Sequence, residues 1–182
     1  MSQIEISYEK LEQEFIKELV ELGTEAVHSE RSILATSQDD NVTARRMRLL
    51  SDGLNLYGWS NPYTRKSEQI IINPKVSVVV EYIQIDGNAL LLGHPTDEPK
   101  FLELIRRKLP TRYESLVKNW RENSDRVVIE VIPKRISLWK YDDPSSGIIG
   151  GLYVLHVDKK KAYRLDYDSI NENHNDAPAY RE

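Results

Sequence analysis

Short runs of β-forming residues follow one another through most of this chain, and this succession constrains the fold more than any other feature. The runs are rich in Val, Ile, Thr and aromatic residues, as strands are. The first five lie at residues 32–37, 42–50, 54–60, 76–82 and 83–93. Short polar turns separate the first three runs, so these strands are expected to pair antiparallel.

Two further pairs of runs extend the pattern toward the C-terminus. Residues 126–132 and 135–141 read as strands on either side of Pro133, and residues 152–157 and 162–167 as a hairpin. With this many short strands in succession, a small antiparallel barrel hides its sheet edges most simply. A β-sandwich is the structural alternative.

Three segments have the spacing of amphipathic helices. The first covers residues 8–22 and follows Ser7, a candidate N-cap. The second covers residues 101–109, and the third begins at a capping box formed by Thr111 and Glu114. The predicted fold class is therefore mostly β with flanking helices, arranged as an antiparallel split β-barrel.

Composition excludes several classes of function. The 182 residues suit a single domain, 1–182, that ends in a polar tail from about residue 169. A net charge of -4 gives no global attraction to nucleic acid, and the absence of Cys excludes disulfides and thiolate chemistry. No apolar run is long enough to span a bilayer, so no membrane association and a cytoplasmic location are expected. The four histidines are scattered, so no metal site is predicted, and the paired carboxylates lie in expected turns, so no catalytic dyad is predicted.

Basic residues gather between residues 42 and 74. Period-two alternation places Arg46 and Arg48 on one face of a strand, and Arg45 with Met47 and Leu49 on the other. A second group is expected in one loop. Together these groups offer the donors that suit a phosphate monoester, namely Arg46, Arg65, Lys66, Ser60 and Thr64. An ordinary solvated surface is the alternative that composition leaves open.

The order of these motifs resembles the pyridoxamine 5'-phosphate oxidase-like family of FMN-binding split barrels, and within it the general stress protein branch. The blocks that carry the resemblance are Arg46-Met47-Arg48-Leu49-Leu50, Trp59-Ser60-Asn61, Thr64-Arg65-Lys66 and Asn73-Pro74-Lys75-Val76-Ser77. The resemblance implies that FMN is the cofactor and that it lies at the interface of a homodimer. It implies this cofactor-binding set: Arg46, Met47, Arg48, Leu49, Trp59, Ser60, Thr64, Arg65, Lys66 and Trp139.

Within that set the resemblance gives each group a role. Arg46, Arg65 and Lys66 would hold the phosphate, the segment from Met47 to Leu49 would line the isoalloxazine with Trp59, and Trp139 would approach from the partner side or serve as a core residue. The segment that binds substrate in the oxidases proper is not matched at residues 137–143. An oxidoreductase with an undefined substrate is therefore expected, using a small-molecule electron donor such as NAD(P)H and an acceptor. The alternatives are an F420-dependent split-barrel reductase and a non-catalytic protein that binds flavin or haem.

Overall fold

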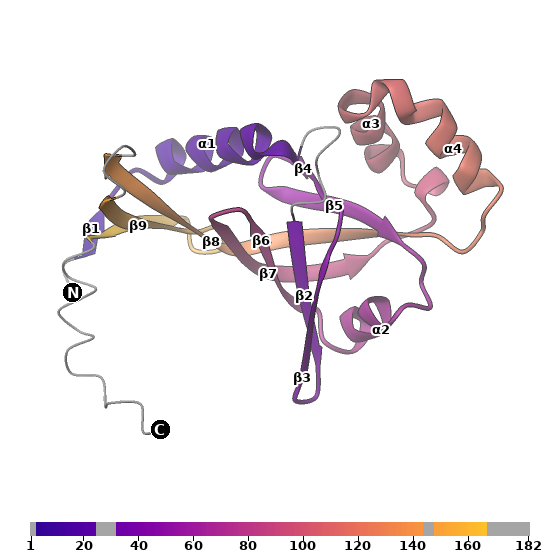
Figure 1. The fold of residues 1–182 in the computed structure, drawn as a ribbon, viewed down its shortest axis with the longest axis horizontal. Helices are drawn as coiled ribbons and strands as arrows, with labels where there is room; N and C mark the ends of the chain where they lie inside the picture. Colours follow the sequence, from indigo (N-terminus) through magenta and orange to yellow (C-terminus); the bar gives the residue numbers. More distant parts are fainter. Residues whose placement is uncertain (1–2, 25–31, 144–147, 167–182) are drawn as a thin grey trace.

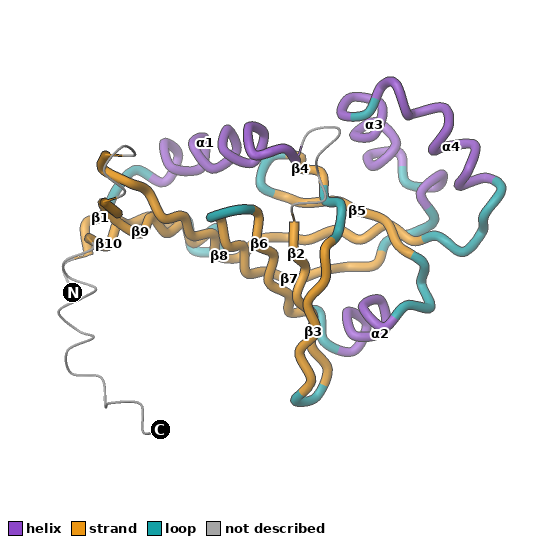
Figure 2. Tube along the Cα trace, viewed as in Figure 1, coloured by secondary structure: helices purple, strands orange, loops and turns teal. Residues whose placement is uncertain are grey.

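The computed structural model describes residues 3–24, 32–143 and 148–166, in which one large antiparallel sheet is surrounded by helices (Figure 1). The strands are β1 (Gln3–Glu5), β2 (Ser32–Gln38), β3 (Asn41–Arg46), β4 (Leu50–Asp52), β5 (Asn55–Ser60), β6 (Lys75–Val80), β7 (Ile83–Leu91), β8 (Val127–Asp143), β9 (Ile148–His156) and β10 (Lys161–Asp166). The helices are α1 (Tyr8–Leu19) with a π-helical turn (Val20–Thr24), α2 (Arg65–Ile72), α3 (Pro99–Lys108) and α4 (Tyr113–Arg121), plus 3₁₀ turns at Pro95–Asp97 and Pro110–Arg112. Figure 2 shows the helices standing at three separate places around the sheet.

The strand order is β1-β10-β9-β8-β7-β6-β2-β3, and every pairing is antiparallel. The long strand β8 splits the sheet, because one of its edges pairs first with β5 and then with β9. Strand β4 adds to the outer edge of β5. The predicted class, mostly β with flanking helices, is confirmed. The expectation that the barrel hides its edges is not, since among the described residues β3 has β2 as its sole partner.

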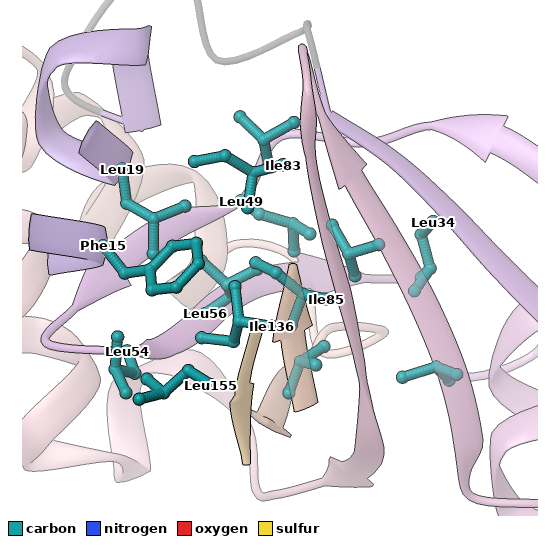
Figure 3. Close-up of a cluster of buried hydrophobic side chains, with 14 of the residues drawn as sticks. Phe15, Leu19, Leu34, Leu49, Leu54, Leu56, Ile83, Ile85, Ile136 and Leu155 are labelled. Atoms are coloured by element: carbon teal, nitrogen blue, oxygen red, sulfur yellow. The ribbon is translucent and has the colours of Figure 1, made fainter. Parts of the chain in front are cut away.

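Helix α1 covers the larger core. Its predicted N-cap is confirmed, because the Ser7 hydroxyl accepts a hydrogen bond from the Lys10 backbone N–H at 3.2 Å. The helix turns Phe15 and Leu19 onto the sheet, and neither is exposed to solvent. Figure 3 shows these two side chains facing sheet residues that include Leu56. Burial of this apolar surface supplies most of the stability of a fold this size.

A second, smaller core forms at the other end of the molecule. Helices α3 and α4 pack together there (Figure 1), and their buried side chains include Phe101 and Trp120. From the sheet they receive Leu50 and Val128, with Trp59 partly buried against them. This core therefore fixes the ends of β4, β5 and β8 against a helical pair.

Strand β8 is continuous, where the sequence predicts two strands separated by Pro133. The chain absorbs the proline because the register with β7 shifts at Asp86 and Gly87. A Cβ on Gly87 would lie 2.3 Å from the carbonyl oxygen of Ile132, so the close approach requires glycine. A glycine opposite a proline thus keeps the two predicted strands in one ladder.

Three other predictions are wrong in detail. Arg65 and Lys66 begin helix α2 instead of lying in a loop, and the strand expected over residues 42–50 ends at Arg46. The capping box fails because a 3₁₀ turn brings Arg112 to the N-cap of α4, with no side-chain capping bond. The predicted polar tail lies outside the described residues. In the part of the chain that the structure describes, no helix is long and apolar enough to cross a membrane.

Candidate functional site

A pocket of about 280 Å³ opens where β3 ends and the chain crosses to β4. Its lining is formed by Arg46, Met47, Arg48 and Trp59. Arg46 is exposed and Arg48 is half-buried, whereas Met47 is 8% exposed. The pocket therefore combines two guanidinium groups with one thioether and one aromatic face.

Gly58 on β5 lets the segment that carries these residues approach so closely. A Cβ at this position would lie 2.7 Å from the Arg48 carbonyl oxygen, 2.8 Å from Met47 Cε and 2.9 Å from Leu49 Cδ2. Real Cβ atoms essentially never approach other atoms this closely. The absence of a side chain at Gly58 thus allows the segment from Met47 to Leu49 to lie directly against β5, beside Trp59.

Trp59 is held in place from behind. Its ring makes edge contacts with Trp120, at 5.5 Å between centroids, and with Phe101, at 6.1 Å. Such T-shaped pairs are worth about 0.5 to 1.5 kcal/mol beyond the area that they bury. The smaller core therefore presents Trp59 to the pocket as a rigid wall.

A hydroxyl cluster follows directly in the chain. The hydroxyls of Ser60 and Thr64 lie 3.3 Å apart, and those of Thr64 and Ser67 lie 3.0 Å apart. Thr64 and Ser67 each donate to the Asn61 carbonyl oxygen at 3.0 Å. This cluster leads the chain from β5 into α2 and places Arg65 and Lys66 in the first helical turn.

Arg45 of β3 adds a third cation to Arg65 and Lys66 of α2. Its guanidinium donates to the Leu34 carbonyl oxygen at 3.1 Å and to the Thr36 hydroxyl at 2.7 Å, and it also contacts the Thr43 hydroxyl. Gln69 of α2 lies beside it, with Oε1 3.5 Å from Arg45 Nη2. The sequence pattern places Arg45 on the strand face opposite Arg46 and leaves it out of the candidate set, although three arginines in four residues was the available signal.

The electrostatics of this region are one-sided. Burial lowers the pKa of Arg45, and the nearby Arg65 lowers it further. Burial likewise lowers the pKa of Lys66, with a contribution from Arg45. Within the described residues none of these three cations, nor Arg46, forms an ion pair with a carboxylate. An anion would relieve this repulsion.

The predicted cofactor-binding residues fall into separate groups. Arg46, Met47, Arg48 and Trp59 line the pocket, and Ser60, Thr64, Arg65 and Lys66 lie at the start of α2. Successive side chains of a strand point to opposite faces. Because Arg45 contacts α2 through Gln69, the side chain of Arg46 begins on the face of β3 that points away from α2.

Two predicted residues lie apart from both groups. The side chain of Leu49 is fully buried in the larger core. Trp139 lies eleven residues along β8 from Val128, the partner of Trp59, which corresponds to roughly 36 Å of strand. No cluster of three or more His, Asp or Glu side chains among the described residues is arranged to hold a metal ion.

Comparison with known families matches residues 14–140 to the family described as pyridoxamine 5'-phosphate oxidase. A search of curated proteins finds no match. Several solved structures are similar. A candidate pyridoxamine 5'-phosphate oxidase from Listeria innocua is 27% identical with a TM-score of 0.51, and the match covers 69% of this chain and 95% of that chain.

Two more structures are similar at lower identity. A pyridoxamine 5'-phosphate oxidase-related, FMN-binding protein from Nostoc punctiforme is 12% identical with a TM-score of 0.56, covering 88% of this chain and 96% of that chain. General Stress Protein 26 from Bacillus anthracis is 22% identical with a TM-score of 0.49, covering 69% of this chain and 91% of that chain. The resemblance inferred from the motifs and the predicted split-barrel fold are thus confirmed.

Proposed function

The chain belongs to the pyridoxamine 5'-phosphate oxidase family, and from that premise we propose that it binds FMN and acts as an oxidoreductase. Two observations carry the proposal: the cations around α2 have no carboxylate partner among the described residues, and the pocket at the end of β3 has two arginines and an aromatic wall. Cofactor sites commonly combine apolar walls with a few convergent polar groups. A basic cluster without such a wall would suit inorganic phosphate equally well.

The residues present fit the two ends of FMN. Trp59 and Met47 offer apolar surface to a flat ring system. Arg65 and Lys66 at the start of α2 would be donors for the phosphate, where charge-assisted hydrogen bonds are each worth about 1.5 to 3 kcal/mol, whereas Arg46 lines the pocket with Trp59. Ser60 would add a neutral donor, whereas the Thr64 hydroxyl already donates to the Asn61 carbonyl oxygen.

When bound, FMN supplies the hydride and single-electron chemistry, and the protein supplies binding and orientation. Trp59, fixed by the smaller core, limits how the ring can lie. The cations at the start of α2 neutralise the phosphate. No acidic or basic side chain of the chain is assigned a proton-transfer step, so a small-molecule electron donor and an acceptor complete the proposed reaction.

A homodimer is part of the proposal. Three exposed apolar residues support it, because Ile33 and Val79 are cross-strand partners on the outer face of β2 and β6, and Val42 lies on the neighbouring β3. Strand β3 also has an unpaired outer edge among the described residues. A second copy would cover this face and could bring its own Trp139 toward the pocket. Light scattering during size-exclusion chromatography tests the expected mass of two chains.

The first experiment is the visible absorption spectrum of the purified protein after FMN is added and the unbound excess removed. We expect a two-band flavin spectrum at close to one FMN per chain. Absence of retained flavin would overturn the FMN assignment, and displacement of FMN by F420 at lower concentration would favour the deazaflavin alternative. Full occupancy without turnover by NAD(P)H and a panel of acceptors would indicate a non-catalytic flavin-binding protein.

A further inference from the structure

We propose that a second pocket, beside the N-terminal half of α1, binds a small monocarboxylate whose body is apolar, such as a single aromatic ring. This pocket has a volume of about 280 Å³ and shares no lining residue with the pocket at the end of β3. The proposal therefore goes beyond the proposed FMN function. The lining includes Ile6, Lys10, Leu11, Glu14, Lys140 and Tyr153.

The second pocket lies where the larger core ends. Leu138 of β8 and Leu155 of β9 are buried in this core. Period-two alternation continues their rows to Lys140 and Tyr153, which therefore lie on the face of the sheet that α1 covers. Lys140 contacts Glu14 of α1 there. Figure 1 shows α1 and β9 at the opposite end of the molecule from α3 and α4, whose core holds the aromatic wall of the first pocket.

The walls of the second pocket suit an apolar body. Leu11 is 2% exposed and belongs to the larger core, and Ile6 packs against that core. Tyr153 adds an aromatic ring, whose centroid lies 5.0 Å from Lys140 Nζ and 5.7 Å from Arg164 Cζ. The volume is close to the lower limit of ligand pockets, about 300 Å³, so a ligand with one ring is the size that fits.

The charges of the lining favour a monoanion. Two lysines and one glutamate give it a net charge of +1. Lys140 contacts Glu14, whereas Lys10 forms no ion pair with a carboxylate among the described residues. The uncompensated positive charge attracts one carboxylate and repels a cation.

Lys140 is able to contact a ligand as well as Glu14. An ammonium group has further N–H donors beyond the one that a single carboxylate contact uses. Burial lowers the pKa of Lys140, so its charged form is costly at this position. A second carboxylate nearby would offset this cost. A ligand carboxylate between Lys10 and Lys140 would thus leave its ring for Tyr153 and the apolar floor.

The test compares para-fluorobenzoate with para-fluorobenzamide, which have nearly the same shape and differ in charge. Titration of the full chain, followed by fluorine NMR at one ionic strength, measures both affinities. We expect saturable binding of the acid that is about tenfold tighter than binding of the amide. Because the two pockets are separate, added FMN should not displace the acid.

The decisive variant is Glu14→Gln, because it should strengthen binding. The change keeps the shape of the side chain, removes the negative charge and releases Lys140, so the acid should bind about fivefold more tightly. Damage to the pocket would weaken the acid and the amide alike. Lys10→Gln, at an exposed position, should weaken the acid about fivefold and leave the amide unchanged.

The matched control is Lys17→Gln, which removes an exposed lysine of α1 that lies 3.6 Å from Glu21 and outside the pocket. It should change neither affinity, and thermal unfolding confirms that each variant is folded. Equal affinities for the acid and the amide, or no saturable binding of the acid, would overturn the proposal. Displacement of the acid by FMN would assign the probe to the first pocket, and unchanged or weaker binding in Glu14→Gln would also contradict the site.

Discussion

Two charged regions of the molecule are built on opposite plans. Around α1, lysines meet carboxylates: Lys140 contacts both Glu14 and the ring of Tyr153, and Lys17 lies 3.6 Å from Glu21. Around α2, the cations lie beside one another and beside neutral acceptors (Figure 1 shows α1 and α2 on different sides of the sheet). Basic side chains therefore stabilise the fold around α1, where they pair with carboxylates, and destabilise it around α2, where they repel one another.

The difference indicates which charges are available to a ligand. Exposed ion pairs are typically worth about 0 to 1 kcal/mol, so the pairs around α1 leave little charge unbalanced. The cations around α2 repel each other until an anion binds. A ligand that binds only the native state stabilises it in proportion to its excess over Kd, so bound FMN should raise the Tm of this protein.

The largest expected effect is loss of FMN affinity in the double variant Arg65→Gln, Lys66→Gln. Removing two charged donors at about 1.5 to 3 kcal/mol each should weaken binding by at least 100-fold. The matched control, Lys17→Gln, Lys160→Gln, removes two cations around α1 and should leave FMN affinity unchanged. Equal losses in the two double variants, measured by flavin fluorescence, would show that only net charge matters and would remove the contrast between the regions.

The sequence predicted the strands of this fold better than the turns between them. Alternation located β2, β5, β6 and β7 to within a few residues, because one face of each is buried. Helix α2 was missed because it spans only eight residues and two of its three buried side chains, Ser67 and Gln69, are polar. It forms because Ser67, Gln69 and Ile70 are buried against the sheet, a tertiary effect.

The sequence motifs predicted most residues of the candidate site, but they did not predict how these residues lie relative to one another. The alternation of side chains predicts correctly which face each residue of β3 occupies. Because the strand ends at Arg46, this alternation could not predict the position of Leu49, which lies in the larger core. The position of Arg45 beside α2 was missed because the sequence pattern did not reveal that helix. Contacts between residues 24 positions apart, such as Arg45 with Gln69, are set by the tertiary fold rather than by local pattern.

A second prediction tests shape at the pocket instead of charge. Gly58→Ala should lower the free energy of unfolding by about 1 to 3 kcal/mol, because the new Cβ meets the Arg48 carbonyl oxygen at 2.7 Å and the backbone must shift. Gly93→Ala is the control, since its new Cβ meets only the movable Glu98 carboxylate. Urea unfolding measures both. A smaller loss in Gly58→Ala than in Gly93→Ala would contradict the close approach of the pocket segment.

A third prediction sharpens the contrast at α1. Lys140→Gln should lower the free energy of unfolding by about 1 kcal/mol, because it removes the contact with Glu14 and the cation over the Tyr153 ring. FMN affinity should not change. A double-mutant cycle with Glu14→Gln measures the coupling directly, and a coupling of zero would show that the pairing around α1 contributes nothing to stability.

The smallest expected effect distinguishes two tyrosines, Tyr57 beside the smaller core and Tyr82 beside α1. Tyr57 on β5 donates to Glu130 at 2.5 Å, and Tyr82 donates to Glu18 of α1 at 2.8 Å. Burial, with the nearby carboxylate, raises the pKa of each to about 12 from the ordinary value of 10.0. A raised native-state pKa means that this stabilisation is complete below pH 10 and is lost as the pH rises toward about 12.

Removing the hydroxyl should therefore flatten the alkaline decline in stability. Because Tyr82 is 47% exposed and solvent screens its carboxylate, Tyr57→Phe should flatten the decline more than Tyr82→Phe does. Urea unfolding between pH 9 and about 12 measures the slopes. Identical slopes in the wild type and Tyr57→Phe would show that Glu130 does not hold the proton on Tyr57. A larger change in Tyr82→Phe would place the stronger tyrosine-carboxylate coupling at α1 and contradict the expected order.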